Sequence, residues 1–247
     1  MNEPRTAALL SALIAVSLSI CASSDPSSRA NVLERLAKGE RDFASLEAPG
    51  VDLSEVDFQG SKLFGANLRG TNLARAKLQN CNLDLAILRE ATLVEADLSN
   101  ASLFSSVFAD ADLSRANLSG VRLMGNFQGA TLEGANLAFA KGGADMRNQP
   151  MGLVRAELAR AKLKGADLHG ADLSRADLSF ADLRETDLRD VNFMRAKLAG
   201  ADLTGAKLAG ARFEEAEIDN ADFRGATGLD SALGLDTVRG RESALFD

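Results

Sequence analysis

From Val51 to Arg224 the sequence repeats with a period of five residues. Its clearest stretch, residues 166–185, reads ADLHG ADLSR ADLSF ADLRE, with a small residue first, a polar residue second and a large apolar residue third. An α-helix has about 3.6 residues per turn and a β-strand a period of two, so neither keeps one constant face at this period. The chain must therefore turn once in every repeat.

The large apolar residue of each repeat, here called its centre, recurs in two unbroken series, Leu53 to Leu123 and Leu153 to Phe223. A small residue, most often Ala, stands two positions before most centres, and the residue between them is usually polar. This order predicts a narrow interior in which large and small side chains pack together. The expected core centres include Leu53, Leu73, Leu93, Leu113, Leu153, Leu173, Phe193 and Phe213.

The tandem motif Ala-(Asp/Asn)-Leu-x-x resembles that of the pentapeptide-repeat family, and the resemblance covers most of the chain. It implies an all-β fold, a right-handed quadrilateral parallel β-helix in which four repeats form one square coil. Coils joined by backbone hydrogen bonds would rise by about 4.8 Å each. The expected solenoid spans residues 51–225, with about 8–9 coils and short helical caps at both ends.

The period is disturbed between residues 124 and 152. Phe127, Leu132 and Leu137 come one residue early, and regularity then lapses until Leu153. Because Leu123 and Leu153 are thirty residues apart, a multiple of five, the early shift and the later insertion cancel. We predict one continuous solenoid with a local bulge, no large projecting loop, and eight and a half coils between Leu53 and Phe223.

Residues 1–23 have the pattern of an export signal. Arg5 precedes an apolar run from Ala7 to Ile20, which is followed by small residues. The run has the length of a signal-peptide core and is short for a membrane span. A buried N-terminal helix is the structural alternative.

The end of this leader allows two kinds of processing. Residues 18–21, Leu-Ser-Ile-Cys, resemble the lipobox of bacterial lipoproteins, which implies lipidation of Cys21. Ile20 departs from the Gly or Ala usual before that cysteine. Ordinary cleavage after Ala22 or Ser23 is therefore the competing outcome, and both remain open.

The segments that flank the repeats are expected to cover the ends of the solenoid. Residues 24–50 are a linker with a short amphipathic helix from about Ser28 to Lys38, because apolar residues recur there at helical spacing before Gly39. Residues 226–247 are expected to form a C-terminal cap of short helical turns. Leu245 and Phe246 would pack on the last coil or on a second subunit, giving a homodimer.

The sequence predicts no catalytic residue, no cofactor site and no metal site. The single histidine, His169, follows a centre at a position expected to face solvent, with no Ser or Cys nucleophile placed beside it. Asp110 and Asp112 lack the other ligands of a calcium loop. The formal net charge of −7 also argues against direct nucleic acid binding.

Residues twenty positions apart should stack in columns along one side of the coil. One column alternates in sign, and two others have like charges, so the like-charged columns are the candidate interaction surfaces. The alternating column is Glu55, Arg75, Glu95 and Arg115; the basic column is Arg155, Arg175 and Arg195, followed by Glu215; the acidic column is Asp182, Asp202 and Asp222.

These features favour a non-enzymatic exported protein, a rigid scaffold for an unknown protein partner in the cell envelope. Its expected location is the periplasm, or the thylakoid lumen in a photosynthetic bacterium, with membrane attachment only through a lipidated Cys21. The family resemblance implies an alternative, a DNA-mimicking protein that binds type II topoisomerases and protects them from quinolones, if the chain stays in the cytoplasm. The leader and the mixed surface charges argue against that alternative.

Overall fold

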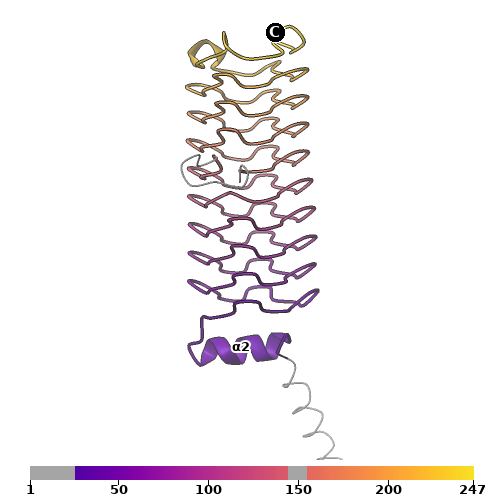
Figure 1. Cartoon of the computed structure of the whole chain (residues 1–247), viewed down its shortest axis with the longest axis vertical. Coiled ribbons are helices and arrows are strands. Elements are labelled where there is room, and N and C mark those ends of the chain that lie inside the picture. The colour runs from indigo at the N-terminus through magenta and orange to yellow at the C-terminus, as the bar shows by residue number, and fades with distance from the viewer. Residues whose placement is uncertain (1–25, 144–154) are drawn as a thin grey trace, which may run out of the picture.

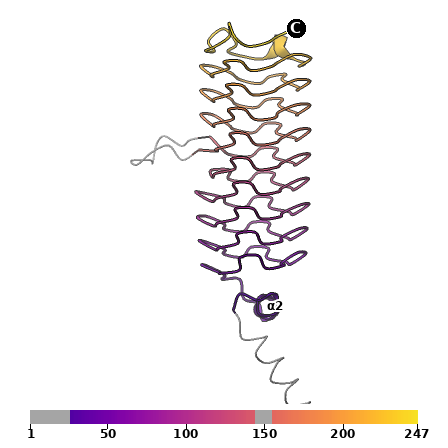
Figure 2. The same cartoon turned by 90° about the vertical axis from the view of Figure 1, so that its right-hand side faces the viewer.

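The computed structural model describes residues 26–143 and 155–247. Over these residues the chain winds into square coils that stack into a rod, with one repeat on each side of a coil (Figure 1, Figure 2). The polar second residue of each repeat forms a parallel bridge to its counterparts in the coils above and below, as in Asn72, Thr92 and Asp112. Each side contributes a single bridged residue, so the fold is a quadrilateral β-helix built from very short sides.

The bridges form four ladders, which define the sides of the rod. Side A runs from Asp42 to Leu233, side B from Glu47 to Arg239, side C from Asp52 to Leu245 and side D from Asp57 to Thr227. The ladders continue through the irregular part of the sequence, since Asn126 on side B bridges to Glu157. The repeat region is therefore one continuous solenoid.

Each corner is made by the same local turn. The N–H of the small residue donates to the C=O of the preceding centre, as from Ala176 to Leu173 at 3.0 Å. The fifth residue of the repeat has a positive φ, such as 62° at Arg175. An Asp or Asn at the second position accepts the N–H two residues later, as when Ser174 donates to Asp172 at 3.0 Å. This bond explains the Asp/Asn preference of the motif, because these side chains stabilise turns in this way.

The interior of the rod is a continuous apolar core. The centres are 0–1% exposed, and they join the small residues in one cluster. Phe108 and Phe127 stack at 4.8 Å between ring centroids, and Phe193 and Phe213 at 5.3 Å. Of the expected core centres, Leu153 lies outside the described residues, and the others are buried.

Helix α2 (Arg29–Ala37) lies across the N-terminal end of the rod (Figure 1). Ser28 caps it by accepting the N–H of Asn31, and Val32 is fully buried. Arg29 donates to the backbone oxygens of Asp52 and Ser54 at 2.9 and 3.0 Å, which ties the helix to the solenoid. No described helix is long and apolar enough to cross a membrane.

The C-terminal segment differs from the expected helical cap. Its sequence reads ATGLDS ALGLDT VRGRES ALFD, a period of six, and bridges at Thr227, Leu233, Arg239 and Leu245 extend all four ladders by one coil. The helical part in the described C-terminal segment is one turn, η1 (Leu229–Ser231). The predicted cap of helical turns was wrong, because sides of six residues still place one residue each in line with the bridged residues of the coil before.

In this last coil glycine replaces the centre. Gly228, Gly234 and Gly240 have φ of 75–79°, and a hydroxyl three residues later donates to each glycine oxygen. Phe246 ends the coil and stacks on Phe223 at 5.0 Å. The final coil therefore narrows the interior and closes it with one ring.

The disturbance of the period has a different origin from the predicted bulge. One residue is missing at the corner between sides A and B, where Arg122 and Asn126 are four residues apart. In the next coil, at the same corner, Lys141 and Glu157 are sixteen residues apart. The C=O of Gly142 accepts the N–H of Ala156 at 3.0 Å, the bond that closes every regular corner. Thirteen residues thus stand between Gly142 and Ala156 where a regular corner has two, so eleven residues are inserted at this corner. The bridged residues on either side of it, Lys141 and Glu157, still belong to the neighbouring sides A and B.

This arrangement corrects two predictions. The chain omits one residue at one corner and gains eleven at the same corner of the next coil, a net gain of ten residues. Ten residues are two repeat lengths, so the spacing from Leu123 to Leu153 remains a multiple of five in spite of the insertion. The premise that no residues are spare for a projecting loop was therefore wrong, and the inserted residues 144–154 themselves lie outside the described part of the chain. Leu53 and Phe223 are also eight coils apart, both on side C, and not eight and a half.

Candidate interaction surfaces

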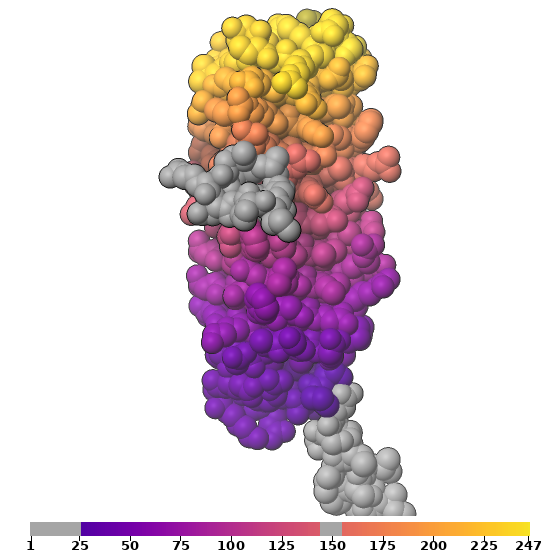
Figure 3. All heavy atoms as spheres, in the orientation of Figure 1, coloured from indigo at the N-terminus to yellow at the C-terminus, as the bar shows by residue number. Residues whose placement is uncertain are grey.

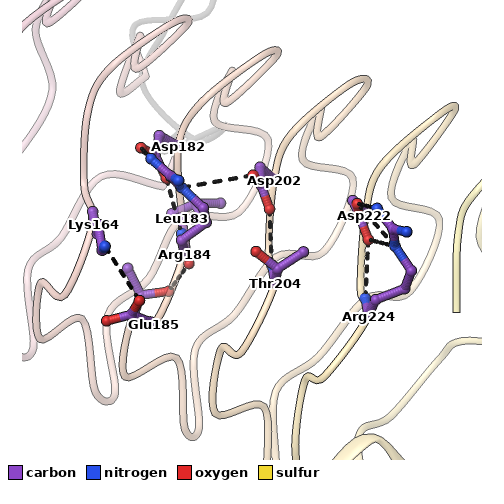
Figure 4. A network of polar contacts seen from close by, with 10 residues as sticks. Lys164, Asp182, Leu183, Arg184, Glu185, Asp202, Thr204, Asp222 and Arg224 are labelled. Carbon is purple, nitrogen blue, oxygen red and sulfur yellow. Dashed lines mark hydrogen bonds and ion pairs between the residues drawn. The ribbon is translucent and has the colours of Figure 1, made fainter. Parts of the chain in front are cut away.

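The acidic column lies on side C and is largely neutralised. Asp182, Asp202 and Asp222 are bridged in series, as their spacing predicts. Arg184 lies 2.6 Å from Asp182 and 3.7 Å from Asp202, and Arg224 lies 2.6 Å from Asp222. Figure 4 shows these contacts along side C. The hydrogen bond from Arg184 lowers the pKa of Asp182, and that from Arg224 lowers the pKa of Asp222. This column therefore presents paired charges and not a free acidic stripe.

The basic column lies at the corner between sides A and B. Arg175 and Arg195 stand at the fifth position of successive side-A repeats, and Arg155 ends the turn that carries the insertion, one coil earlier. Arg195 is paired with Glu215 at 2.8 Å, and Arg155 lies 3.8 Å from Asp177. Arg175 has no ion pair among the described residues, so it is the free cation of this column.

The alternating column is paired along side C. Arg75 lies 2.7 Å from Glu55, and Arg115 lies 3.0 Å from Glu95. All four side chains are exposed, so solvent screens each pair and each contributes little to stability. The column adds little stability and leaves no net charge on this part of the surface.

The described residues contain no cluster of three or more His, Cys, Asp or Glu side chains that could hold a metal ion. His169 is partly exposed, with Nδ1 3.1 Å from the backbone oxygen of Arg189 and the ring against Phe139 at 5.4 Å. Nδ1 also lies 3.7 Å from a carboxylate oxygen of Asp190. His169 thus lies on the outside of the coil, as predicted, and is half-buried there.

Cys81 is buried in the small-residue position of its repeat. Its Sγ donates to the backbone oxygen of Phe58 at 3.1 Å, and burial raises the pKa of the thiol to about 11. The neutral thiol is therefore a small apolar filler, and not a nucleophile. Cys21, the expected lipidation site, lies outside the described residues.

The sequence analysis missed an exposed apolar strip. Phe64, Leu85 and Ile87 are 45%, 48% and 42% exposed, and they lie at the corner between sides A and B in two successive coils. The signal was present in the sequence: Phe64 and Leu85 stand at the variable fourth and fifth positions, and Ile87 stands at the second position, which is polar in most repeats. Figure 3 shows one face of the rod, with the N-terminal end in indigo and the C-terminal end in yellow at its two ends.

Comparison with known proteins gives matches along most of the repeat region. The sequence matches the family described as pentapeptide repeats, in eight copies, over residues 153–190 and 192–227, and the pentapeptide repeat region over residues 51–137. No curated protein matches the sequence closely enough to count as a relative.

Several solved structures are similar to this chain. HetL, a pentapeptide repeat protein involved in heterocyst differentiation regulation in Nostoc sp. strain PCC 7120, is 32% identical, with 87% of this chain and 98% of HetL covered and a TM-score of 0.46. QnrB1, a plasmid-mediated fluoroquinolone resistance protein, is 16% identical over 79% and 93% of the two chains, with a TM-score of 0.43. A thylakoid-lumen protein of Arabidopsis thaliana is 22% identical over 70% and 68%, with a TM-score of 0.24.

The family matches agree with the ladders, the corners and the buried centres described above. Members of this family form right-handed quadrilateral β-helices. The chain belongs to the pentapeptide-repeat family.

Proposed function

We propose that this protein is a non-enzymatic scaffold, a rigid rod that presents a surface to a protein partner. The observation that carries the proposal is the unbroken set of ladders, which holds surface residues of successive coils at fixed spacing. Many charged groups of the described residues are engaged in pairs with each other, and those residues contain no group of three or more His, Cys, Asp or Glu that could hold a metal ion. Such a rod suits recognition better than chemistry.

We further propose that the rod is exported. The support is the leader pattern of residues 1–23, which has the order of a signal peptide. Fractionation of cells that express the full chain tests this. A processed protein in the envelope fraction is expected, whereas an unprocessed cytoplasmic protein would refute export and favour the topoisomerase-binding alternative. In that case a gyrase supercoiling assay with a quinolone should show protection.

Lipidation of Cys21 is tested separately. Labelling with radioactive palmitate should mark the wild-type chain and leave a Cys21→Ala variant unlabelled. An unlabelled wild type that is nevertheless cleaved would assign ordinary signal-peptide processing.

The C-terminal coil is the proposed surface for a homodimer. Leu233 and Leu245 are 52% and 47% exposed on this coil, which ends the described ladders. Light scattering with size exclusion chromatography would compare the wild type with a Leu233→Lys, Leu245→Lys variant. A dimer that becomes a monomer supports the interface, and a wild-type monomer at all concentrations excludes it.

A further inference from the structure

Side B has an apolar edge in three successive coils of the N-terminal half. Ile87 bridges to Val107 in the next coil, and the N–H of Leu85 donates to the C=O of Phe104 at 2.9 Å. These four residues and Phe64, one coil before Leu85, form the apolar strip, which follows the corner with side A. Exposed large apolar groups in contact with each other are typical of binding surfaces.

Other exposed aromatic residues already have packing partners. The rings of Phe139 and Phe180 lie over Gly170 and Gly200 in the next coil, so closely that a Cβ on either glycine would meet the ring at 2.6–2.7 Å. In the apolar strip, the Arg122 guanidinium lies 4.3 Å from the ring centroid of Phe104. The other large exposed side chains of the strip are more than two-fifths exposed, namely Phe64, Leu85 and Ile87.

The opposite edge of side B, its corner with side C, is charged in the same three coils. Arg69 lies in the first of these coils, Arg89 and Glu90 in the second, and Asp110 in the third. Arg69 pairs with Glu90 at 3.1 Å, whereas Arg89 and Asp110 have no ion pair among the described residues. This edge is therefore neutral in sum, with a cation at one end and an anion at the other. We call side B of these three coils, with both of its edges, the B face.

The charged edge is complementary to itself under two-fold symmetry. When two rods lie antiparallel with side B against side B, a two-fold axis at Ile87 sets the first coil of one copy against the third coil of the other. Arg69 then faces Asp110 of the second copy. In the central coil Arg89 faces Glu90 of the second copy, so each cation on this edge meets an anion.

The apolar edge is complementary to itself in the same arrangement. Phe64 faces Phe104 of the second copy, while Leu85 and Ile87 meet their own counterparts at the axis. Two parallel rods, related by an axis along their length, would instead set the apolar edge of one copy against the charged edge of the other. That arrangement would remove charges from water against apolar groups, which is costly, so the antiparallel arrangement is favoured.

Asp84 is the remaining charged residue of the B face, at the corner with side A. Its carboxylate accepts the Oγ–H of Ser102 at 2.5 Å and the N–H of Phe104 at 2.9 Å, and it lies 4.0 Å from Arg122. These partners hold Asp84 within its own chain, and its side chain is 19% exposed. It therefore places no free like charge at the axis.

We infer that the B face joins two copies of this chain into an antiparallel dimer, with the two-fold axis at Ile87. In the next pair of coils Glu47 would face Asn126 of the second copy, so no like charges meet there either. All of these residues precede the insertion. The interface is separate from the C-terminal coil, and it depends neither on the proposed scaffold function nor on export.

Charge reversal tests the two-fold arrangement. The measurement is the dimer Kd by sedimentation equilibrium, in a Leu233→Lys, Leu245→Lys background that removes any C-terminal contact. Arg69→Glu and Asp110→Arg should each weaken the dimer at least tenfold, and the two together should restore it. Within one chain these residues are two coils, about 10 Å, apart, so restoration requires contact between copies. A monomeric background protein, or a double variant no better than the single ones, would overturn the inference.

Apolar substitutions locate the contact on the other edge. Leu85→Ser with Ile87→Ser should weaken the dimer at least tenfold. Phe139→Ser is the matched control and should leave the Kd unchanged, since Phe139 is 58% exposed but lies at the corner between sides D and A. Circular dichroism would verify that each variant is folded. An unchanged Kd in the Leu85/Ile87 variant, or an equal loss in the control, would contradict the B face.

Disulfide trapping tests the position of the axis. Ile87→Cys in a Cys21→Ala background should give a disulfide-linked dimer on mild oxidation, because a residue at the axis meets its own counterpart. Lys77→Cys, exposed on side D, is the control and should stay monomeric on a reducing-free gel. Equal crosslinking of both variants, or none from position 87, would refute the axis. That result would leave the scaffold proposal standing, since a monomeric rod can still present a surface to a partner.

Discussion

At the scale of the residue, the first position of each repeat sets the strictest requirement. Ala is the usual occupant, and the buried polar exceptions bond to backbone oxygens: Thr71 Oγ1 donates to Ala48 at 2.7 Å, and Ser106 Oγ to Leu103 at 2.7 Å. Ser61 differs, because its buried Oγ has no partner among the described residues. A buried hydroxyl without a hydrogen bond loses its hydration and gains nothing in return.

Replacing Ser61 by Ala should therefore stabilise the protein. We expect a gain of about 1 kcal/mol in the free energy of unfolding, which corresponds to roughly 2–4 °C in Tm for a chain of this size. Thermal denaturation followed by circular dichroism measures it. Ser106→Ala is the matched control and should give no gain, because that hydroxyl is bonded. A lower Tm for Ser61→Ala would show that Ser61 has a partner after all.

Cys81 should make stability depend on pH in the alkaline range. Its pKa is raised from 9.0 to about 11 by burial, so the folded state favours the neutral thiol. The resulting stability is complete below pH 9 and is lost as the pH rises from 9 to 11. The loss relative to Cys81→Ala should reach about 2–3 kcal/mol in denaturant titrations. A difference between the two proteins that stays constant from pH 7 to about pH 11 would contradict the buried neutral thiol.

At the scale of the element, the corner is the unit that matters. The buried centre, the small residue before it and the outward polar residue were all predicted from the sequence, because their spacing alone requires them. The positive φ of the fifth residue was not, since this position is held by residues as different as Arg175, Phe180 and Gly200. The bonds of the corner impose this conformation whatever the side chain.

Two departures from the period of five, the insertion and the last coil, could not be predicted correctly from the sequence, for different reasons. The insertion between Lys141 and Glu157 has a length that, with the omitted residue, restores the phase, so phase alone could not reveal it. The last coil carries a readable signal, the small residue and glycine that recur every six residues from Ala226 onward, but six-residue sides were mistaken for helical turns. Among the candidate surfaces, the charged columns could be predicted from the twenty-residue spacing of their members. The ion pairs within them could not, because these depend on the length and direction of each side chain.

Replacement of the glycine in a six-residue side, such as Gly234, should destabilise the protein more than replacement of a glycine at a regular corner. A Cβ at Gly234 would meet the backbone nitrogen of Glu214 at 2.6 Å, in addition to the strain of a φ of 75°. Gly65 also has a positive φ, but its Cβ would meet only Ser45 Oγ at 3.8 Å. We expect Gly65→Ala to cost about 1 kcal/mol, from backbone strain alone. Gly234→Ala should lower the free energy of unfolding clearly more, and urea titration of both variants measures the difference. Equal losses would mean that the last coil rearranges to accommodate the added methyl group.

At the scale of the whole molecule, each coil depends on its neighbours alone, so a change within one corner should leave the rod intact. Deletion of residues 144–154 tests this. It leaves Gly143 and Arg155 between Gly142 and Ala156, the two residues that every regular corner has between centre and small residue. We expect an unchanged circular dichroism spectrum and a Tm within about 2 °C of the wild type, less than 1 kcal/mol. Unfolding or aggregation of this variant would show that the insertion holds the two halves together.

The direction of the ladder bonds has a mechanical consequence. The bonds between coils, such as that from Leu183 to Asp202 at 2.7 Å, join each coil to the next along the axis of the rod. A force that pulls the two ends of the rod apart would break the bonds of one coil before those of the next, so the coils would separate in sequence and not all at once. Each regular coil that peels away would release twenty residues, or about 70 Å of extended chain. The rod would therefore lengthen in steps under load, with one longer step at the coil that carries the eleven-residue insertion.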